Sequence, residues 1–391
     1  MHILHLTPYY APAYAFGGVV RAVEGMAQAL VAQGHQVTVL TTDALDQQSR
    51  YHRADDEVLN GVRVIRCANV STSLRGKLNL STPRHMRQVA QAILPDVDVV
   101  HIHEFRTVEN LLVTPVAHDL NKPIVLSPHG TLNLSTGRSR LKVGWDKMLS
   151  AGVALRIDHV IALVEPELED VQTLWQTFGR RQIPTQFSII PNGIHLDDFS
   201  NLPPADDFRE KYGLDDAPTV LFMGRLQQRK GVDILVKAFQ LADVQDSRLL
   251  IVGPDEGMLD TVRALTDGDE RIVITGYLGG DDRLKALSAS DVFVLPAIGE
   301  GLSMAVLEAM GAGLPVILSH GCNMTDVEPN GAGFVMDVSP DAIADKLRLL
   351  LTDAGLRQQM GHASRQLITQ KYTWEKVALK LDSVYQQVNR V

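Results

Sequence analysis

Residues 2–42, HILHLTPYYAPAYAFGGVVRAVEGMAQALVAQGHQVTVLTT, contain a complete strand, helix and strand pattern. The apolar runs HILHLTP and QVTVLTT at its two ends are rich in the aliphatic and β-branched residues typical of buried strands. Between them, the stretch from about Val19 to Ala32 has the length and apolar spacing of a helix. A strand, a helix and a second strand in this order predict a parallel βαβ unit, and therefore an α/β fold.

The same alternation continues along the chain. Further strand candidates are VRVIRC, VDVVHIH, PIVLSPH, HVIALV and FSIIPN in the first half, and TVLFMGR, RLLIVG, RIVITG, DVFVLP and LPVILS in the second. The Pro-, Asp- and Asn-rich segment NGIHLDDFSNLPPADDF, residues 192–208, separates the two sets. The pattern predicts two doubly wound parallel-sheet domains, residues 1–195 and 196–371, followed by an amphipathic helix over residues 372–391.

Composition excludes several classes of protein. The chain has 391 residues, of which 45% are hydrophobic and 21% charged, as in soluble globular proteins, and a formal net charge of −9 argues against nucleic acid as a partner. Cys67 and Cys322 lack the spacing of a metal site or a disulfide framework. No run of about 18 apolar residues predicts a membrane-spanning helix. We therefore expect a cytoplasmic protein.

Ligands of doubly wound sheets bind at the carboxyl ends of the strands, so the segments that follow strands are the candidate sites. Gly17 and Gly18 follow the first strand and enter a helix. Two glycines allow a ligand to approach the backbone closely, and a helix N-terminus favours an anion. A plain strand-to-helix turn is the alternative, since the dinucleotide fingerprint G-x-G-x-x-G is absent here.

The stretch LFMGRLQQRKGVDILVKAF, residues 221–239, ends a strand at Gly224 and places two cations in the following turn. Arg225 offers a planar fork that suits a phosphate, and Lys230 adds a mobile point charge. The sequence thus suggests a phosphate site, with a pair of solvated surface cations as the alternative.

The stretch GEGLSMAVLEAMGAGLPVI, residues 299–317, contains two glutamates around an expected helix start near Leu302. Glu300 precedes the helix and Glu308 lies within it, so the two do not face one bond as a general acid and base would. We interpret Glu300 as an acceptor for sugar hydroxyls and Glu308 as an acceptor for a ribose. The backbone amides of residues 301–304 would then lie beside a charged linkage.

Two patterns invite a metal site. Asp96-Val97-Asp98 has the D-x-D form of metal-dependent transferases, but it leads into a strand instead of following one. His101 and His103 alternate along that strand and share one face, yet no third ligand has a recognisable spacing. We therefore interpret these two as packed histidines and expect neither a metal ion nor another cofactor.

Several motifs, in this order, resemble those of the family 4 retaining glycosyltransferases, which have the GT-B fold. They are the Gly17-Gly18 turn, HIHE, SPHGTL, IIPNGI, the pattern G-R-L-x-x-x-K-G, VITGYL, E-G-L-S-M-A-V-L-E and the terminal YTWEKVA, and they cover essentially the whole chain. The resemblance implies two Rossmann-like domains facing a central cleft, with the final helix crossing back to the first domain. It also implies that the first domain binds the acceptor and the second the donor.

The resemblance implies a role for each matching residue. Arg225 and Lys230 would neutralise the donor diphosphate, with Gly17, Gly18 and Gly224 allowing close backbone approach. Glu300 would hold the sugar hydroxyls beside Gly301, Leu302, Ser303 and Met304, and Glu308 would hold the ribose. His129 would reach an outer hydroxyl of the sugar. Tyr277 and Leu278 would lie against the base.

The expected activity is transfer of a hexose, with retention of configuration and without a metal, from a nucleotide sugar to a hydroxyl acceptor. UDP-glucose is the first expected donor, with UDP-N-acetylglucosamine, UDP-galactose and GDP-mannose as alternatives. A saccharide or lipid-linked saccharide in cell-envelope polysaccharide synthesis is the expected acceptor. A nonhydrolysing nucleotide-sugar epimerase and a noncatalytic nucleotide-sugar binding protein remain as alternatives. A glycogen-type phosphorylase would need a pyridoxal-phosphate lysine, for which the sequence offers no clear candidate.

Two basic stretches interrupt the first domain and bear on the acceptor. Interleaved with Leu, Met and Trp145, they suggest peripheral contact with an anionic membrane, and an ordinary solvated face is the alternative. Their cations are Arg75, Lys77, Arg84, Arg87, Arg138, Arg140, Lys142 and Lys147.

Overall fold

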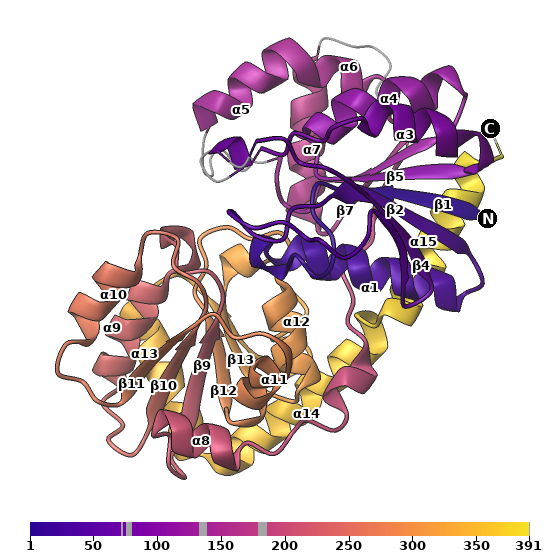
Figure 1. Cartoon of the computed structure of the whole chain (residues 1–391). Helices are drawn as coiled ribbons and strands as arrows, with labels where there is room; N and C mark the ends of the chain where they lie inside the picture. Colours follow the sequence, from indigo (N-terminus) through magenta and orange to yellow (C-terminus); the bar gives the residue numbers. More distant parts are fainter. Residues whose placement is uncertain (72, 76–79, 133–138, 179–185, 391) are drawn as a thin grey trace. The chain divides into compact units, whose positions relative to one another are not determined.

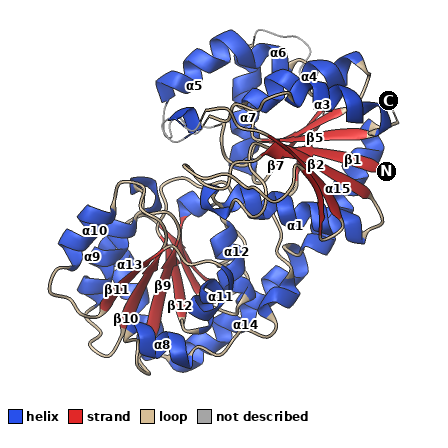
Figure 2. Cartoon of the chain, viewed as in Figure 1, coloured by secondary structure: helices blue, strands red, loops and turns tan. Residues whose placement is uncertain are grey.

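The computed structural model describes residues 1–71, 73–75, 80–132, 139–178 and 186–390. Figure 1 shows that the chain forms two compact units. Unit 1 comprises Met1–Gly193 together with Trp374–Val391, and unit 2 comprises Ile194–Thr373. Each unit contains one sheet with helices on both faces, as Figure 2 shows, which is the arrangement of a doubly wound α/β fold.

The sheet of unit 1 has the strand order β3-β4-β2-β1-β5-β6-β7-β8. All neighbouring strands pair in parallel except β3, which pairs antiparallel with β4 at the edge. The central strands are buried apart from the first residues of β1 and β2, because helices cover both faces. The bounds are β1 His2–Leu6, β2 Gln36–Thr42, β3 Asp56–Leu59, β4 Val62–Cys67, β5 Val99–His103, β6 Ile124–Ser127, β7 His159–Ala162 and β8 Gln186–Ile189.

The helices of unit 1 pack in two groups. Helix α3 packs against α4 and α4 against α6, while α1 packs against the C-terminal helix α15. The last contact is close, because a Cβ on Gly25 would lie 2.0 Å from Trp374 Nε1. The bounds are η1 Tyr14–Phe16, α1 Gly18–Ala32, α3 Met86–Ile93, η2 Leu94–Asp96, α4 Val108–Asp119, α5 Ser139–Trp145, η3 Asp146–Ser150, α6 Ala151–Ala154, α7 Glu165–Thr177 and α15 Trp374–Val388.

The sheet of unit 2 is parallel throughout, with the order β11-β10-β9-β12-β13-β14. In chain order within the unit, this is the 3-2-1-4-5-6 arrangement of the Rossmann fold. Its central strands β9, β12 and β13 consist almost entirely of fully buried apolar residues. The bounds are β9 Thr219–Met223, β10 Arg248–Val252, β11 Ile272–Gly276, β12 Val292–Leu295, β13 Val316–Ser319 and β14 Gly333–Met336.

The helices of unit 2 also form two groups. Helix α9 packs against α10 and α13, and α12 packs against α14. The bounds are η4 Leu196–Phe199, α8 Asp206–Tyr212, η5 Gln228–Lys230, α9 Val232–Ala242, α10 Leu259–Thr266, α11 Gly280–Ser288, α12 Met304–Gly311, η6 His320–Cys322, α13 Pro340–Thr352 and α14 Ala354–Lys371.

The topology determines where each unit can bind a ligand. The strand order reverses direction between β1 and β5 in unit 1 and between β9 and β12 in unit 2. Loops that leave the carboxyl ends of such a strand pair diverge to opposite faces and leave a crevice between them. The segments after β1, β5, β9 and β12 are therefore the positions to search for a site.

Two local expectations differ from the structure. The edge strands β3 and β14 were not among the predicted strands. Helix α12 begins at Met304 instead of near Leu302, with Ser303 as its N-cap, so that Glu308 is its fifth residue. Within the described residues, no helix is both long and apolar enough to cross a bilayer.

Candidate functional site

The loop after β9 carries the two predicted phosphate-binding cations. Arg225 lies directly after Gly224, and its Nη1 atom is 2.8 Å from Glu256 Oε1 in a partly exposed ion pair. Lys230 ends the short helix η5 and is 8% exposed. Sequence reasoning had not anticipated Glu256 as the partner of Arg225. An arriving phosphate would therefore compete with this carboxylate for the guanidinium.

Lys230 and Glu300 form a shielded ion pair. Lys230 Nζ lies 2.8 Å from Glu300 Oε2, and the two side chains are 10% and 9% exposed. Glu300 Oε1 is buried and accepts no hydrogen bond from the described residues. A buried carboxylate oxygen without a donor is costly unless another group supplies one. This atom is therefore a ready acceptor for a ligand hydroxyl.

Close backbone contacts brace the two loops that carry this pair. Ile298 N donates to Arg229 O at 2.8 Å, and Arg229 Nη1 donates to Gly299 O at 3.3 Å. Gly231 has a φ of 67°, and a Cβ there would lie 2.2 Å from Pro296 O. Only glycine permits this approach, so Gly231 and Arg229 fix Lys230 against the loop after β12. The sequence motif G-R-L-x-x-x-K-G ends at Gly231, but sequence reasoning gave neither Gly231 nor Arg229 a role.

A third loop supports Glu300 from the other side. Glu300 N donates to Gly321 O at 2.9 Å, and Asn323 Nδ2 donates to Glu300 O at 2.6 Å. A Cβ on Gly321 would lie 2.4 Å from Ala297 O, so glycine is required at this contact as well. The loops after β9, β12 and β13 thus hold the Lys230–Glu300 pair in one geometry.

The segment after Glu300 leads into α12. Gly301 and Leu302 precede Ser303, whose side chain makes no capping hydrogen bond, and Met304 begins the helix. The helix N-terminus therefore keeps its positive end uncapped by this side chain, directly after the Lys230–Glu300 pair. An anionic linkage beside these residues would be stabilised by the helix.

Glu308 is not a free carboxylate in this structure. Its Oε2 atom lies 2.5 Å from Nη1 of Arg283 on α11, and the two side chains are only 8% and 13% exposed. The predicted ribose contact would have to share Glu308 with this arginine. Arg283 lies on the helix before the one that carries Glu308, and no motif in the sequence pointed to it.

The predicted base-binding residues follow β11. Gly276, with a φ of 77°, ends that strand and is followed by Tyr277 and Leu278. The Tyr277 side chain is 50% exposed, whereas Leu278 is 9% exposed. A half-exposed aromatic ring at the carboxyl end of a strand is available for stacking, so the contact of these two residues with a base stays a prediction.

In unit 1, Gly17 and Gly18 lie where the sequence suggested, at the start of α1. Gly17 has a φ of 103° and a ψ of −159°, a conformation that favours glycine, and it is the N-cap residue of α1. No side chain caps the helix at this residue. The geometry fits an anion-binding turn, although Gly17 N already donates to Tyr14 O at 3.0 Å.

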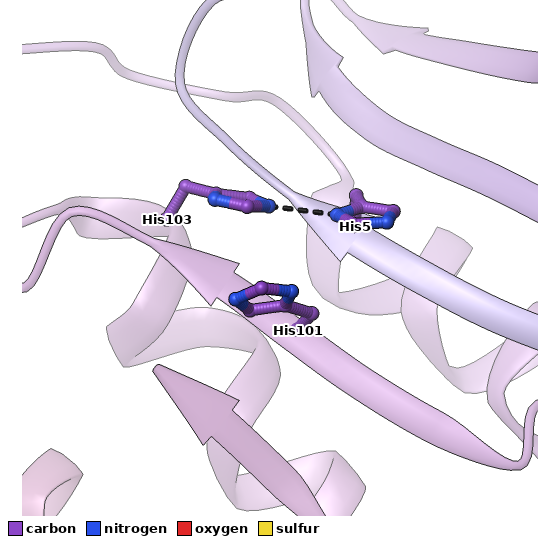
Figure 3. Close-up of side chains that lie close together, drawn as sticks. All are labelled: His5, His101 and His103. Carbon is purple, nitrogen blue, oxygen red and sulfur yellow. Dashed lines mark hydrogen bonds between the residues drawn. The ribbon is translucent and has the colours of Figure 1, made fainter. Parts of the chain in front are cut away.

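His129 belongs to a cluster of four histidines at the carboxyl ends of β1, β5 and β6. Register explains the cluster, because His5 on β1 lies opposite His101 on β5, and His103 is two residues further on the same face. His103 Nδ1 is 2.9 Å from His129 Nε2, and His103 Nε2 is 2.7 Å from His5 Nδ1. Figure 3 shows the contact between His5 and His103, with His101 beside them.

The cluster is held in its neutral form. Burial lowers the pKa of His5 to about 3 and that of His129 to about 4. Burial, reinforced by the neighbouring imidazoles, lowers the pKa values of His101 and His103 well below the ordinary value. His129 also has a strained φ of 56°, and Gly130 N after it donates to the buried Glu167 carboxylate. Strained residues at the ends of strands are common at functional sites.

His5, His101 and His103 are close enough to be considered as metal ligands, since their nitrogens lie within 4.8 Å of one another. However, both His101 nitrogens already have partners, Tyr385 OH at 2.7 Å and Ser127 Oγ at 2.8 Å. His5 and His103 are bonded to each other. The hydrogen bonds therefore favour packed histidines.

The D-x-D sequence lies elsewhere. Its Asp98 accepts a hydrogen bond from His2 N at 2.7 Å, at the opposite end of the sheet.

The basic residues of the two stretches in unit 1 are exposed only in part, whereas the sequence suggested that all of them lie on the surface. Arg75 is 1% exposed and donates from Nε to Gln47 O at 3.2 Å, so the prediction that it lies on the surface is wrong. Arg84 and Arg87 are exposed, as is Lys147. Lys77, Arg138 and the side chain of Arg140 lie outside the described residues. Near Lys147, Met148 is 83% exposed, which is unusual for a large apolar side chain.

Comparison with known proteins agrees with this architecture. A family profile described as "Glycosyltransferase Family 4" matches residues 16–198, and one described as "Glycosyl transferases group 1" matches residues 204–367. An uncharacterized glycosyltransferase of Methanocaldococcus jannaschii is 28% identical over 98% of both chains. A GDP-mannose-dependent alpha-(1-6)-phosphatidylinositol monomannoside mannosyltransferase of Mycobacterium tuberculosis is 30% identical, over 73% of this chain and 78% of that protein.

Among solved structures, HepE of Anabaena in complex with UDP-glucose superposes with a TM-score of 0.75 at 18% identity. The match covers 99% of this chain and all of HepE. The two Rossmann-like units and this structural match show the GT-B fold, as the sequence predicted. The chain belongs to the family 4 glycosyltransferases.

Proposed function

We propose that the protein is a retaining hexosyltransferase that moves a hexose from a nucleoside diphosphate sugar to a hydroxyl acceptor without a metal ion. The observation that supports this most directly is the Lys230–Glu300 pair, in which Glu300 Oε1 is buried without a donor among the described residues. A nucleotide sugar would supply the missing donor to Glu300 and an anion for Lys230. Its diphosphate would bind Lys230, and a sugar hydroxyl would donate to Glu300.

The chemistry needs a stabilised leaving group. As the bond between the sugar and the phosphate breaks, negative charge develops on the diphosphate, and preorganised cations and N–H groups lower the barrier. Lys230, Arg225 and the N-terminus of α12 supply positive charge at the carboxyl edge of the sheet in unit 2. The acceptor hydroxyl would attack from the same face that the diphosphate leaves, with the diphosphate taking its proton.

UDP-glucose is the first candidate donor. Glu300 and His129 suit a hexose with free hydroxyls, and HepE, which has the same fold, has been crystallised with UDP-glucose. GDP-mannose is the second candidate, because relatives at 30% identity are GDP-mannose-dependent mannosyltransferases. In both donors the diphosphate joins the nucleoside to the hexose.

We further propose that the acceptor is a saccharide or a lipid-linked saccharide of the cell envelope, reached by peripheral contact with an anionic membrane. The feature that supports this is a patch at the end of α5 and in η3, where Val143, Met148 and Leu149 are exposed beside Lys147. Exposed apolar side chains interleaved with a cation suit a lipid surface.

The proposed activity can be tested by a thermal-shift panel of UDP, GDP and ADP with their common sugar conjugates, in EDTA. We expect stabilisation by one nucleotide class, of about 3 kcal/mol at a ligand concentration about a hundred times its dissociation constant. Loss of that stabilisation in the chelator would overturn metal independence. Turnover of the donor with no acceptor present would instead indicate an epimerase, and binding without transfer to any acceptor a noncatalytic binding protein.

A further inference from the structure

Three imidazoles in unit 1 form one continuous hydrogen-bonded line. His5 Nδ1 is 2.7 Å from His103 Nε2, and His103 Nδ1 is 2.9 Å from His129 Nε2. The ring planes of His5 and His103 are 14° apart, and those of His103 and His129 are 26° apart. Figure 3 shows the inner part of this line, His5 and His103, with His101 beside it but outside it. His101 bonds instead to Tyr385 and Ser127.

Counting protons shows that the line has only two states. A neutral imidazole has one N–H donor and one acceptor nitrogen, so three neutral rings share three protons. Two protons lie in the two hydrogen bonds, and the third must be at one end, on His5 Nε2 or on His129 Nδ1. Both end atoms are buried and have no partner among the described residues. Since each bond fixes the direction of the next, all three rings must adopt the same tautomer.

The two ends offer the last proton different surroundings. His5 is fully buried within the sheet, where an N–H at Nε2 would have no acceptor among the described residues. Buried N–H groups without an acceptor are rarer in proteins than under-satisfied acceptors, which favours a lone pair at this end. The His129 residue, after β6 at the carboxyl edge of the sheet, is partly exposed, whereas His5 is 0% exposed, so the last N–H is better placed at the His129 end, nearer to solvent or to a ligand oxygen.

We propose that His103, backed by His5, holds the proton of His129 on Nδ1, so that His129 is a neutral hydrogen-bond donor to a ligand oxygen and not a general base. His103 and His5 are thus positioning residues that act through His129. The inference rests on the proposed function only in taking that oxygen to belong to the donor sugar. The tautomer itself is a property of the protein without ligand.

The backbone around His129 supports a fixed ring orientation. His129 adopts a left-handed conformation, with a φ of 56°, and Thr131 N donates back to Pro128 O at 3.3 Å. Glu167 accepts hydrogen bonds from Gly130 N and from Leu163 N, which ties the loop after β6 to the loop after β7. The loop therefore holds Nε2 of His129 against His103 and directs Nδ1 to the other side of the ring.

The direct test is nitrogen NMR of ligand-free protein labelled with ¹⁵N in histidine, in EDTA, with signals assigned through single variants. We expect His5, His103 and His129 all to show the Nδ1–H tautomer at neutral pH. The opposite state would give Nε2–H in all three rings, and that result would overturn the proposal. A protonated His129 at neutral pH would overturn it as well.

Three variants of His103 separate positioning from packing. Asn places its amide where Nδ1 was and keeps a partner for His129, whereas Gln places its amide where Nε2 was and keeps a partner only for His5. Leu keeps neither. In His103→Leu and His103→Gln we expect the His129 signals to lose the pure Nδ1–H pattern, and in His103→Asn we expect the pattern to be retained. Loss in all three variants, or in none, would contradict positioning by His103.

A binding measurement links the tautomer to the ligand. His103→Leu should weaken binding of the nucleotide sugar about tenfold, the scale of one neutral hydrogen bond. The affinity for bare nucleoside diphosphate should change less than about twofold. His103→Asn should restore most of the lost affinity. If the NMR result holds and no nucleotide sugar binds even the unaltered protein, the proposed function fails and the tautomer assignment stands. If a stoichiometric Zn²⁺ ion shifts the His5, His101 and His103 signals, the cluster is a metal site and the proposal is wrong.

Discussion

Lys230 Nζ lies 2.8 Å from Glu300 Oε2, although the two residues follow different strands of the sheet in unit 2. Strands β9 and β12, which precede them, are neighbours at the point where the strand order reverses. The pair therefore occupies the crevice that this topology creates. Each side chain neutralises the other in a setting largely shielded from water.

The first prediction separates the roles of these two residues. Lys230→Ala should weaken the binding of bare UDP or GDP by about 10- to 100-fold, because a charge-assisted hydrogen bond to the diphosphate is lost. Glu300→Ala should leave nucleotide affinity within about threefold, because Glu300 pairs with Lys230 and is not expected to touch the nucleotide. The variant should lose discrimination among sugars, because the proposed acceptor for a sugar hydroxyl is gone. Isothermal titration calorimetry measures both.

Lys211 provides a control for these variants, because it forms an exposed ion pair with Asp282, in which its side chain is 58% exposed. Lys211→Ala should not change nucleotide affinity. Equal weakening of bare UDP by Lys230→Ala and Glu300→Ala would mean that the hydroxyl-binding role assigned to Glu300 is mistaken.

The second prediction concerns two glycines with similar backbone angles. Gly213 has a φ of 61° and open space where a Cβ would lie, whereas at Gly231, with a φ of 67°, a Cβ would meet Pro296 O at 2.2 Å. Gly213→Ala should cost about 1–2 kcal/mol of stability from backbone strain alone. Gly231→Ala should cost about 1–3 kcal/mol more, because the chain must also move away from Pro296. Urea unfolding of the two variants gives the comparison, and equal costs would show that the contact does not constrain the loop.

The third prediction concerns the buried pair of Arg283 and Glu308. Arg283→Leu leaves Glu308 buried without its partner and should cost about 3–5 kcal/mol of stability. The double variant Arg283→Leu, Glu308→Leu should recover most of that loss, since neither charge remains. Arg63→Ala, in an exposed pair with Asp56, should cost less than about 1 kcal/mol. A double variant as unstable as Arg283→Leu would indicate that packing and not charge sets the cost.

The fourth prediction concerns acid. The pKa values of His5 and His129 are lowered to about 3 and about 4 in the folded protein, below the value of about 6.5 expected in the unfolded chain. The unfolded chain therefore binds more protons below about pH 6.5. Stability that is present above that pH should fall as the pH decreases toward about 4, by about 1.4 kcal/mol per unit for each such histidine.

The buried carboxyl groups change the stability in the opposite direction as the pH falls. Burial raises the pKa of Glu109, Asp158 and Glu167, so their contribution favours the folded state as the pH falls. The net change of stability per pH unit should thus be smaller than the sum of the histidine contributions. It should be smaller still in His5→Phe. Denaturant unfolding between about pH 4 and 8 measures it. A stability that is constant over this range in the unaltered protein and in His5→Phe would contradict the neutral cluster.

The fifth prediction concerns membrane contact. The protein should co-sediment with vesicles containing anionic lipid at low salt, and binding should fall as screening increases. Lys147→Glu combined with Met148→Asp should abolish the binding. Leu379→Asp on α15, at a leucine that is 62% exposed, should not affect it. No binding at low salt would remove the membrane hypothesis.

The strands that could be predicted from the sequence are those with both faces covered. Runs such as TVLFMGR and DVFVLP read as buried strands, and the strands β9 and β12 lie within them. Strand β3, Asp56–Leu59, was missed because it lies at the sheet edge and its alternate residues are exposed. Strand β14, Gly333–Met336, starts with glycine and is only partly buried, so its composition carries little strand signal.

The candidate site could be predicted only in part. Lys230 and Glu300 were found because each follows a strand in a recognisable motif, and such loops meet at one edge of a parallel sheet. Arg283, Glu256 and Gly321 were missed because they act through contacts between loops distant in the sequence. Arg75 was misread because the polar and basic residues around it suggested a surface, whereas folding buries its side chain.

By itself, the sequence determined the fold and the family. The spacing of apolar residues, the composition of the strands and the order of the motifs can all be read from the sequence alone. The histidine line illustrates what only the tertiary structure decided. Alternation placed His101 and His103 on one face, but the register of β1 against β5 and the turn after β6 brought His5 and His129 to the same place. Which nitrogen of each ring meets which partner depends on distances between strands, and these exist only once the sheet has formed.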